Sequence, residues 1–180
     1  MGEVKIRPTR PEEVEELWEI GFSDPRAEWT KFNGPYFNQK LPTKEEFVSV
    51  LAYKNWINRP NRLLITYDDQ IVGSVGAGFE DGDLHRWLDM GIIVYRSDLW
   101  DQQIGSRALK LFIDYLFKLY DLPHLGLTTW SGNPRMMHVA QKVGMKQEAC
   151  IRQVRYYHDQ YYDSVKYGIL RNEWKDLKKQ

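Results

Sequence analysis

The sequence predicts a mixed α/β fold: a central, mostly antiparallel sheet with helices packed on both of its faces. Short apolar segments typical of strands alternate along the chain with segments whose apolar residues recur at helical spacing. The order is a strand, two helices, three strands, a helix, a strand, a helix and two strands. The 180 residues fit one domain, and no linker divides them. We therefore expect a single domain over residues 1–180.

The N-terminal third predicts one strand and two helices. Residues 4–8 begin with alternating apolar positions and predict a short strand. Pro11 and the glutamates after it suit the first turn of a helix over residues 12–20. A second helix begins at Thr43, since Thr43-Lys44-Glu45-Glu46 has the pattern of a capping box, and Phe47, Val50 and Leu51 give it an apolar face.

The middle of the chain predicts three strands. Residues 63–67 and 71–79 flank the turn Asp68-Asp69-Gln70 and predict a hairpin. The glycines of the second strand weaken it and indicate that something packs closely on its backbone. Residues 87–94 form a long apolar run, which predicts a buried strand at the centre of the sheet.

The C-terminal half predicts two helices and three strands. They are a helix over residues 104–120, a strand over 125–130, a helix from Asn133 to Gly144, and strands over 146–156 and 161–170. The first helix follows from apolar residues at helical spacing. Asn133 before Pro134 is typical of a helix cap and first turn, and Gly144 of a C-cap.

Composition excludes several classes of protein. Lys plus Arg and Asp plus Glu both number 25, so the net charge is zero, which argues against a nucleic-acid binder. No apolar run is long enough for a transmembrane helix, and the N-terminus lacks the apolar stretch of a signal peptide. The single cysteine, Cys150, fits a reducing, cytoplasmic setting, and we expect it to be a small buried residue.

No motif of metal or nucleophile chemistry is present in the sequence. The four histidines are scattered without the spacing of metal ligands, so no metal site is predicted. There is no Ser-His-Asp nucleophile elbow and no phosphate-binding Gly-Lys-Ser/Thr loop.

The joint between the strand ending at Val94 and the helix from Ile104 is the informative one. The loop of residues 95–103 leads into a helix N-terminus, where backbone N–H groups lack acceptors and the helix dipole favours negative charge. A pyrophosphate is the kind of ligand that such a joint binds.

Three segments resemble the GNAT superfamily of N-acetyltransferases. Trp100-Asp101-Gln102-Gln103-Ile104-Gly105-Ser106-Arg107-Ala108-Leu109 resembles the family's acetyl-CoA pyrophosphate loop. The segment from Asn133-Pro134 to Lys142-Val143-Gly144-Met145 resembles the family's Asn-Pro helix, and residues 161–174 resemble the last strand of the branch with ribosomal-protein N-terminal and spermidine acetyltransferases. The match runs from about residue 63 to the C-terminus, while the N-terminal third fits only in its order of elements.

The pyrophosphate loop departs from the family pattern. Gln103 stands at the family's first glycine, and Gly105 alone is kept. Trp100 stands at an Arg or Gln position, and Asp101 adds a negative charge. The loop is therefore either a modified or a degenerate coenzyme A site.

The resemblance implies a set of cofactor-binding residues for acetyl-CoA. The backbone of Ile92, Ile93 and Val94 would bind the pantetheine arm like an added strand. The pyrophosphate would lie on backbone amides of the loop and helix start: Gln102, Gln103, Ile104, Gly105 and Ser106. Asn133 would contact the pantetheine or the acceptor, although its residue type is equally explained by a helix cap.

Transfer of an acetyl group to an amine calls for a base and an oxyanion donor. Asp89, on the predicted central strand, is the candidate base; a salt-bridged strand residue is the alternative. Ala140 stands where many GNAT enzymes carry a tyrosine acid, so either Ser131 or Tyr156 substitutes, or the thiolate leaves unassisted.

The resemblance thus implies an acetyl-CoA-dependent N-acetyltransferase acting on a primary amine of a small molecule or a peptide N-terminus. The alternatives are a non-catalytic coenzyme A-binding or regulatory module, and an interaction domain. The aromatic segment 29–37 either covers the acceptor site or packs in the core. A homodimer through the last strands is a further expectation from the family.

Overall fold

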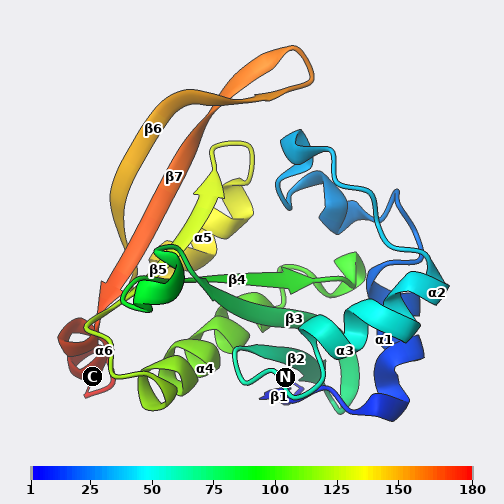
Figure 1. Cartoon of the computed structure of the whole chain (residues 1–180). Helices are drawn as coiled ribbons and strands as arrows, with labels where there is room; N and C mark the ends of the chain where they lie inside the picture. The colour runs from blue at the N-terminus through cyan, green and yellow to red at the C-terminus, as the bar shows by residue number, and fades with distance from the viewer. Residues whose placement is uncertain (1, 180) are drawn as a thin grey trace. The chain divides into compact units, whose positions relative to one another are not determined.

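The computed structural model describes residues 2–179, and its strands form a seven-stranded sheet in the order β1-β2-β3-β4-β5-β7-β6 (Figure 1). The strands are β1 (Val4–Arg7), β2 (Arg62–Tyr67), β3 (Gln70–Phe79), β4 (Leu88–Val94), β5 (His124–Trp130), β6 (Lys146–Tyr157) and β7 (Gln160–Leu170). β4 and β5 pair in parallel, while β1–β2, β2–β3, β5–β7 and β6–β7 are antiparallel. The predicted α/β fold, a mostly antiparallel sheet flanked by helices, is confirmed.

The helices follow the predicted order, with one addition at the C-terminus. They are α1 (Val14–Gly21), α2 (Lys44–Glu46), α3 (Ala52–Asn55), α4 (Ile104–Leu119), α5 (Pro134–Lys142) and α6 (Arg171–Leu177). The 3-10 segment Pro11–Glu13 precedes α1, and a π-helical turn, Phe47–Leu51, joins α2 to α3. Helix α6 was not predicted, because its seven residues are too few to show helical periodicity.

The chain forms two compact units, each of which draws on two segments of sequence. The first unit comprises residues 1–76 and 92–111, and the second comprises residues 77–91 and 112–180. Strands β3 and β4 and helix α4 contribute residues to both units. The single domain expected from the sequence stays a prediction.

An aromatic-rich core holds the first unit together. Its buried members are Val14, Leu17, Trp29, Phe47, Ala52, Trp56, Leu64, Ile71 and Tyr95. The ring of Trp29 makes edge contacts with Phe22 and Tyr95, so Trp29 is a core residue and cannot offer its face to a ligand. The Tyr95 hydroxyl lies 2.8 Å from Ser74 Oγ, and burial raises the pKa of Tyr95 to about 12.

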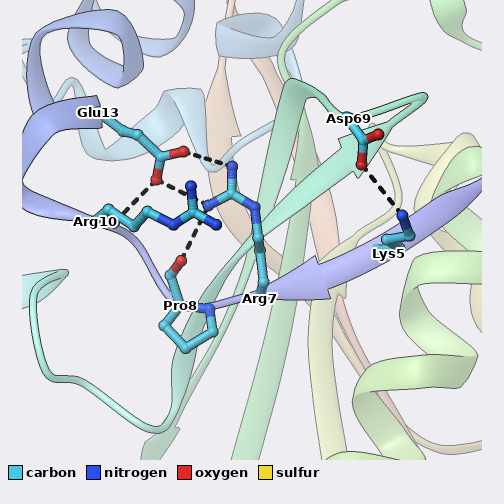
Figure 2. A network of polar contacts seen from close by, with 6 residues as sticks. All are labelled: Lys5, Arg7, Pro8, Arg10, Glu13 and Asp69. Carbon is cyan, nitrogen blue, oxygen red and sulfur yellow. Dashed lines mark hydrogen bonds and ion pairs between the residues drawn. The ribbon is translucent and has the colours of Figure 1, made fainter.

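An ion pair joins β1 to the turn that precedes α1 (Figure 2). The Arg7 guanidinium donates to both carboxylate oxygens of Glu13, at 2.8 and 2.6 Å, and also to the carbonyl of Pro8 at 3.2 Å. The Arg10 N–H donates to the same carboxylate at 3.0 Å. Hydrogen bonds from Arg7 hold the pKa of Glu13 below its ordinary value. Bidentate pairing of this kind is geometrically specific and fixes the direction in which the chain enters α1.

The capping box at Thr43 is confirmed, but the helix that follows is irregular. Thr43 Oγ1 accepts from the Glu46 N–H at 3.2 Å, and the Glu46 carboxylate accepts from the Thr43 N–H at 2.9 Å. The wider π-helical turn then changes the angular position of the side chains after Phe47. As a result Val50, expected on the apolar face, is 56% exposed, and that part of the prediction is wrong.

Close packing on the glycine-rich strand is confirmed at Gly73. A Cβ at this position would lie 2.2 Å from the Ile93 carbonyl oxygen, so no side chain fits between β3 and β4. Gly76 leaves room for the side chain of Arg62 instead, and a Cβ at Gly78 would meet nothing within 4 Å.

In the second unit, the strands bury one face and leave polar groups on the other. Leu125, Leu127, Tyr167 and Ile169 are at most 1% exposed. They alternate with the opposite face of the same strands, which carries Gly126, Thr128, Lys166 and Gly168. In β4, likewise, Leu88 and Met90 are buried, whereas Asp89 is half-buried and Gly91 is exposed. The prediction that β4 is a buried strand is therefore right for one face only.

Helix α6 is anchored to helix α4 within the second unit. The Arg171 guanidinium donates to the carbonyl of Phe117 in the last turn of α4, at 2.8 Å, and to that of Tyr120, directly after α4, at 2.6 Å. The Trp174 indole donates to Asp114, which also pairs with Lys178. Hydrogen bonds from Lys118 and Lys178 hold the pKa of Asp114 far below its ordinary value.

Cys150 lies on β6 and is exposed, so the expectation that it is a small buried residue is wrong. β6 ends the sheet, and most of its residues are exposed to solvent. The Cys150 thiol lies 3.6 Å from Asp163. Partial desolvation and this carboxylate raise the pKa of the thiol.

Across residues 2–179, the structure contains no helix that is long and apolar enough to cross a membrane.

Candidate functional site

The loop between β4 and α4, in the first unit, has the backbone conformation of a glycine-containing loop. Asp101 and Gln103 both have a φ of +63°, in the left-handed region that ordinarily favours glycine. The Gln103 carbonyl accepts from the Arg107 N–H and from Ser106 Oγ, both at 3.0 Å. Gln103 therefore directly precedes α4, and its carbonyl accepts the hydrogen bond from the Arg107 N–H in the first turn of the helix. It stands where the family pattern has glycine, and it keeps the glycine-type φ.

The start of α4 can bind an anion through its backbone. The first N–H groups of a helix, here those of Ile104, Gly105 and Ser106, have no acceptor within the helix. A Cβ at Gly105 would meet nothing within 4 Å, so there is space for a ligand beside it. The Ser106 hydroxyl donates to Gln103, and the Gln102 side chain donates to the Asp98 carbonyl at 3.4 Å. The side chains of Gln102 and Ser106 are thus engaged within the loop, and these residues would contact a ligand through their backbone N–H groups.

Trp100 joins the loop to the end of β4. Its indole N–H donates to the Val94 carbonyl at 2.9 Å, and its ring makes an edge contact with Phe32 at 5.7 Å. Trp100, the residue at the family's Arg or Gln position, therefore stabilises the loop against the strand.

The backbone of β4 has an edge that continues beyond its pairing with β5. The parallel pairing covers Leu88–Met90, and β4 runs on to Val94. Tyr95 N–H donates to the Val72 carbonyl on the β3 side. The backbone N–H and C=O groups of successive strand residues point to alternate sides of the strand. Those of Ile93 therefore point toward β3, in agreement with the short distance from the Ile93 carbonyl oxygen to a Cβ at Gly73, and those of Ile92 and Val94 point to the opposite edge.

Two of the three residues expected to bind the pantetheine arm thus share one edge. With the Val94 carbonyl bound to Trp100, the groups at that edge are the N–H and C=O of Ile92 and the N–H of Val94. By strand alternation the Ile93 peptide is on the β3 side, and a contact between Ile93 and the pantetheine arm stays a prediction.

Asp89 lies in a polar cluster on one face of the second unit. Its carboxylate lies over Gly126, where a Cβ would come within 2.0 Å of Oδ1. It accepts from Thr128 Oγ1 at 2.5 Å, and Lys166 Nζ lies 4.0 Å away. The carboxylate is only 13% exposed. Asp89 is therefore charge-paired on a strand, as the alternative interpretation held, and it is held in one fixed position.

Lys166 and Trp87 complete this cluster and were missed from the sequence. Lys166 Nζ lies 3.0 Å from Thr128 Oγ1 and 5.2 Å from the centre of the Trp87 ring. Thr128 and Lys166 are paired across β5 and β7. Strand alternation can predict which face of its own strand each residue occupies. That Thr128 and Lys166 are neighbours depends on the register between β5 and β7, which residues far apart in the sequence determine.

The Glu148 carboxylate lies over Gly168 in the same way that the Asp89 carboxylate lies over Gly126. Gly126 pairs with Gly168, and a Cβ at Gly168 would come within 2.2 Å of the Glu148 carboxylate. Glu148 pairs with His124 at 2.9 Å. The two paired glycines thus make room for carboxylates on the same face of the sheet.

The other predicted residues of the second unit are not gathered around Asp89. Tyr156 lies at the tip of the long β6–β7 hairpin (Figure 1), paired with Tyr161, which is five residues along β7 from Lys166, roughly 17 Å. Its hydroxyl donates to Asp159 at 3.0 Å, and this hydrogen bond raises the pKa of Tyr156. The structure does not bring Tyr156 and Asp89 together.

Ser131 and Asn133 both lie just after β5. Ser131 Oγ accepts from the Asp163 N–H at 2.9 Å. Asn133 Oδ1 accepts from the Met136 N–H at 3.0 Å, which confirms the helix cap. Within residues 2–179, no three His, Cys, Asp or Glu side chains gather in a way that could hold a metal ion.

Comparison with known proteins identifies the family. The model of the acetyltransferase (GNAT) domain matches residues 3–146. No match was found among curated protein sequences. Similar solved structures include a GNAT-family acetyltransferase from Streptococcus pneumoniae, with 23% identity, coverage of 93% of this chain and 99% of that one, and a TM-score of 0.73.

Two further structures, with lower sequence identity, share the fold. One is spermidine N-acetyltransferase from Vibrio cholerae in complex with CoA and spermine, at 16% identity, 96% and 98% coverage and a TM-score of 0.75. The other is a ribosomal L7/L12 alpha-N-protein acetyltransferase in complex with coenzyme A, at 16% identity, 93% coverage of each chain and a TM-score of 0.72. Because the domain model covers most of its residues, the chain belongs to the GNAT family of acetyltransferases.

Proposed function

We propose that this N-acetyltransferase transfers the acetyl group of acetyl-CoA to a primary amine by direct attack, with Asp89 as the general base. The family supplies the reaction class and the acetyl donor. The observation that carries the proposal for this chain is the loop before α4, where Gln103 keeps a φ of +63° although it is not glycine. The loop thus keeps the backbone conformation that a glycine at this position would give it, directly before the N-terminus of α4.

The start of α4 would bind the pyrophosphate of acetyl-CoA. Backbone N–H groups from Gln102 to Ser106, aided by the helix dipole, suit two adjacent phosphates. The Ile92 N–H and C=O and the Val94 N–H would bind the amides of the pantetheine arm as an added strand does. One of these N–H groups can also stabilise the oxyanion that forms as the amine attacks.

Asp89 would take the proton of the attacking amine. Thr128 and Lys166 hold the carboxylate in one orientation, and a general base needs a fixed position from which to accept the proton. The proton reaches Asp89 directly or through a water molecule, and the new amide forms as the sulfur–carbon bond of the thioester breaks. The amine nitrogen thus loses one proton and gains one acetyl group.

The leaving thiolate has two candidate proton donors in this chain. Ser131 is favoured by its place at the end of β5, beside the Asp163 backbone. Tyr156 is less suited, since its hydroxyl donates to Asp159 and its pKa is raised. Departure of the thiolate without an acid is the third route.

The acceptor we propose is a primary amine of a small molecule or a peptide N-terminus. Structural relatives named for each of these acceptors share the fold. A panel of small amines and short peptides, read by thiol release from acetyl-CoA, tests the proposal. Asp89→Asn should lower kcat by roughly 10²–10⁴-fold and leave coenzyme A binding unchanged. Asp176→Asn, an exposed carboxylate on α6, is the matched control.

Turnover of no amine by a protein that binds acetyl-CoA would contradict the catalytic proposal. It would favour a coenzyme A-binding module instead. Full activity of the Asp89→Asn variant would exclude Asp89 as the base.

We also propose a homodimer and a cytoplasmic location. β6 ends the sheet, and Ile151, Val154 and Tyr156 on it are each about half exposed, a surface that a second copy could cover. Ultracentrifugation should then give twice the chain mass, and a monomer at all concentrations would contradict it. The single cysteine fits a reducing compartment.

A further inference from the structure

The groups around the Lys166 ammonium are those that a binding site for an ammonium ion would contain. Three groups from two segments, residues 87–89 and β5, surround its Nζ: the ring of Trp87 at 5.2 Å, the carboxylate of Asp89 at 4.0 Å and the hydroxyl of Thr128 at 3.0 Å. An aromatic face, a hydroxyl oxygen and a carboxylate are the groups that recognise a primary ammonium ion.

The Asp89 carboxylate and the Thr128 hydroxyl are held in place without Lys166. Asp89 is fixed by its hydrogen bond from Thr128 and lies in the space that Gly126 leaves. Thr128 belongs to a strand that pairs along its length with β7. Trp87 immediately precedes β4, and its carbonyl accepts from the Glu80 N–H at 2.9 Å. The sheet thus fixes the two oxygen-bearing groups beside Nζ and the backbone position of Trp87.

We propose that Trp87, Asp89 and Thr128 form a binding site for a primary alkylammonium ion, and that Lys166 keeps this site filled. The lysine charge balances Asp89 and occupies the aromatic face, so the native protein does not attract other cations there. The binding site itself does not depend on the proposed reaction.

Truncation of Lys166 tests the proposal with a probe of matching shape. Lys166→Ala removes Cγ, Cδ, Cε and Nζ, and n-propylammonium replaces these four atoms. Titration of this variant with n-propylammonium chloride is followed by NMR on the Trp indole N–H resonances. Trp87→Phe assigns the Trp87 signal. The neutral isostere n-propanol, the wild-type protein and Lys142→Ala, which truncates an exposed lysine on α5, are the controls.

The proposal predicts saturable binding to Lys166→Ala that shifts the Trp87 resonance. Binding should be at least about tenfold tighter than for wild type, for Lys142→Ala or for n-propanol. Adding Asp89→Asn to Lys166→Ala should weaken it by a similar factor. If Lys166→Ala does not give a folded spectrum, Lys166→Ser carries the same test.

Absence of binding to the folded variant, equal binding to wild type, or equal binding of n-propanol would each overturn the proposal. The titration contains no nucleotide, so its failure leaves the proposed acetyl transfer untouched. A failure to bind acetyl-CoA would likewise not affect the alkylammonium site.

Discussion

Replacing Gln103 with glycine should stabilise the protein, although glycine destabilises most positions. At a φ of +63° a side chain costs about 1–2 kcal/mol relative to glycine. The greater freedom of glycine in the unfolded chain offsets about 0.5–1 kcal/mol of this gain. The Gln103 side chain is exposed, so little packing is lost. Gln103→Gly should therefore raise the free energy of unfolding by about 0.5–1 kcal/mol.

Gln102→Gly is the matched control. Gln102 is the preceding residue, also exposed, and its φ is not in the left-handed region. Gln102→Gly should lower the free energy of unfolding by about 0.5–1 kcal/mol. The free energies of unfolding of the two variants should therefore differ by about 1–2 kcal/mol. With a urea m-value of about 2 kcal/mol/M, their unfolding midpoints should be about 0.5–1 M apart. Equal destabilisation by both would refute the left-handed assignment, and with it the argument for a preserved loop.

Three further perturbations test other parts of the structure. Gly126→Ala should lower the free energy of unfolding, measured in urea, by about 1–3 kcal/mol, because the new Cβ displaces the Asp89 carboxylate. Gly78→Ala is the control and should be neutral or slightly stabilising, because a Cβ there meets nothing within 4 Å. Equal effects of the two substitutions would refute the close approach of Asp89 to Gly126. Glu13 has a lowered pKa, so its stabilisation is complete above about pH 4.3 and declines as pH falls through the folded value. Glu13→Gln should flatten that acid limb of stability against pH, and an unchanged limb would argue against the Arg7 pair. Tyr95 has a pKa of about 12 against about 10 when unfolded, so its contribution is complete below pH 10 and is lost between pH 10 and 12. Tyr95→Phe should remove that alkaline decline and leave Ser74 Oγ unpaired, at a cost of about 1–3 kcal/mol; a variant as stable as wild type would contradict this.

Features encoded by short sequence signals were predicted well. The turn Asp68-Asp69 has φ values of 48° and 63°, as a tight hairpin requires, and the Thr43 and Asn133 caps form as their residue types indicate. Each of these depends on a few neighbouring residues. The order of strands and helices followed from them.

Features set by distant residues were not predictable in the same way. The cluster of Asp89, Thr128 and Lys166 requires the register of β4, β5 and β7, and no short segment contains that information. Cys150 was expected to be buried from its residue type, but the position of β6 at the end of the sheet decides its exposure. The resemblance to the GNAT family identified the loop before α4, and only the backbone angle at Gln103 shows how that loop is kept.

Isothermal titration with acetyl-CoA, of the wild-type protein and of Gly105→Ala, tests the central claim most directly. A methyl group at Gly105 meets nothing within 4 Å beyond its chain neighbours and the backbone of its own helix, so it leaves the fold intact but fills the space beside the helix N-terminus. The account predicts micromolar binding to wild type, at least about tenfold weaker binding to Gly105→Ala, and unchanged binding to Gly78→Ala. No detectable binding to wild type, or equal affinity for Gly105→Ala, would contradict the assignment of this loop to the pyrophosphate.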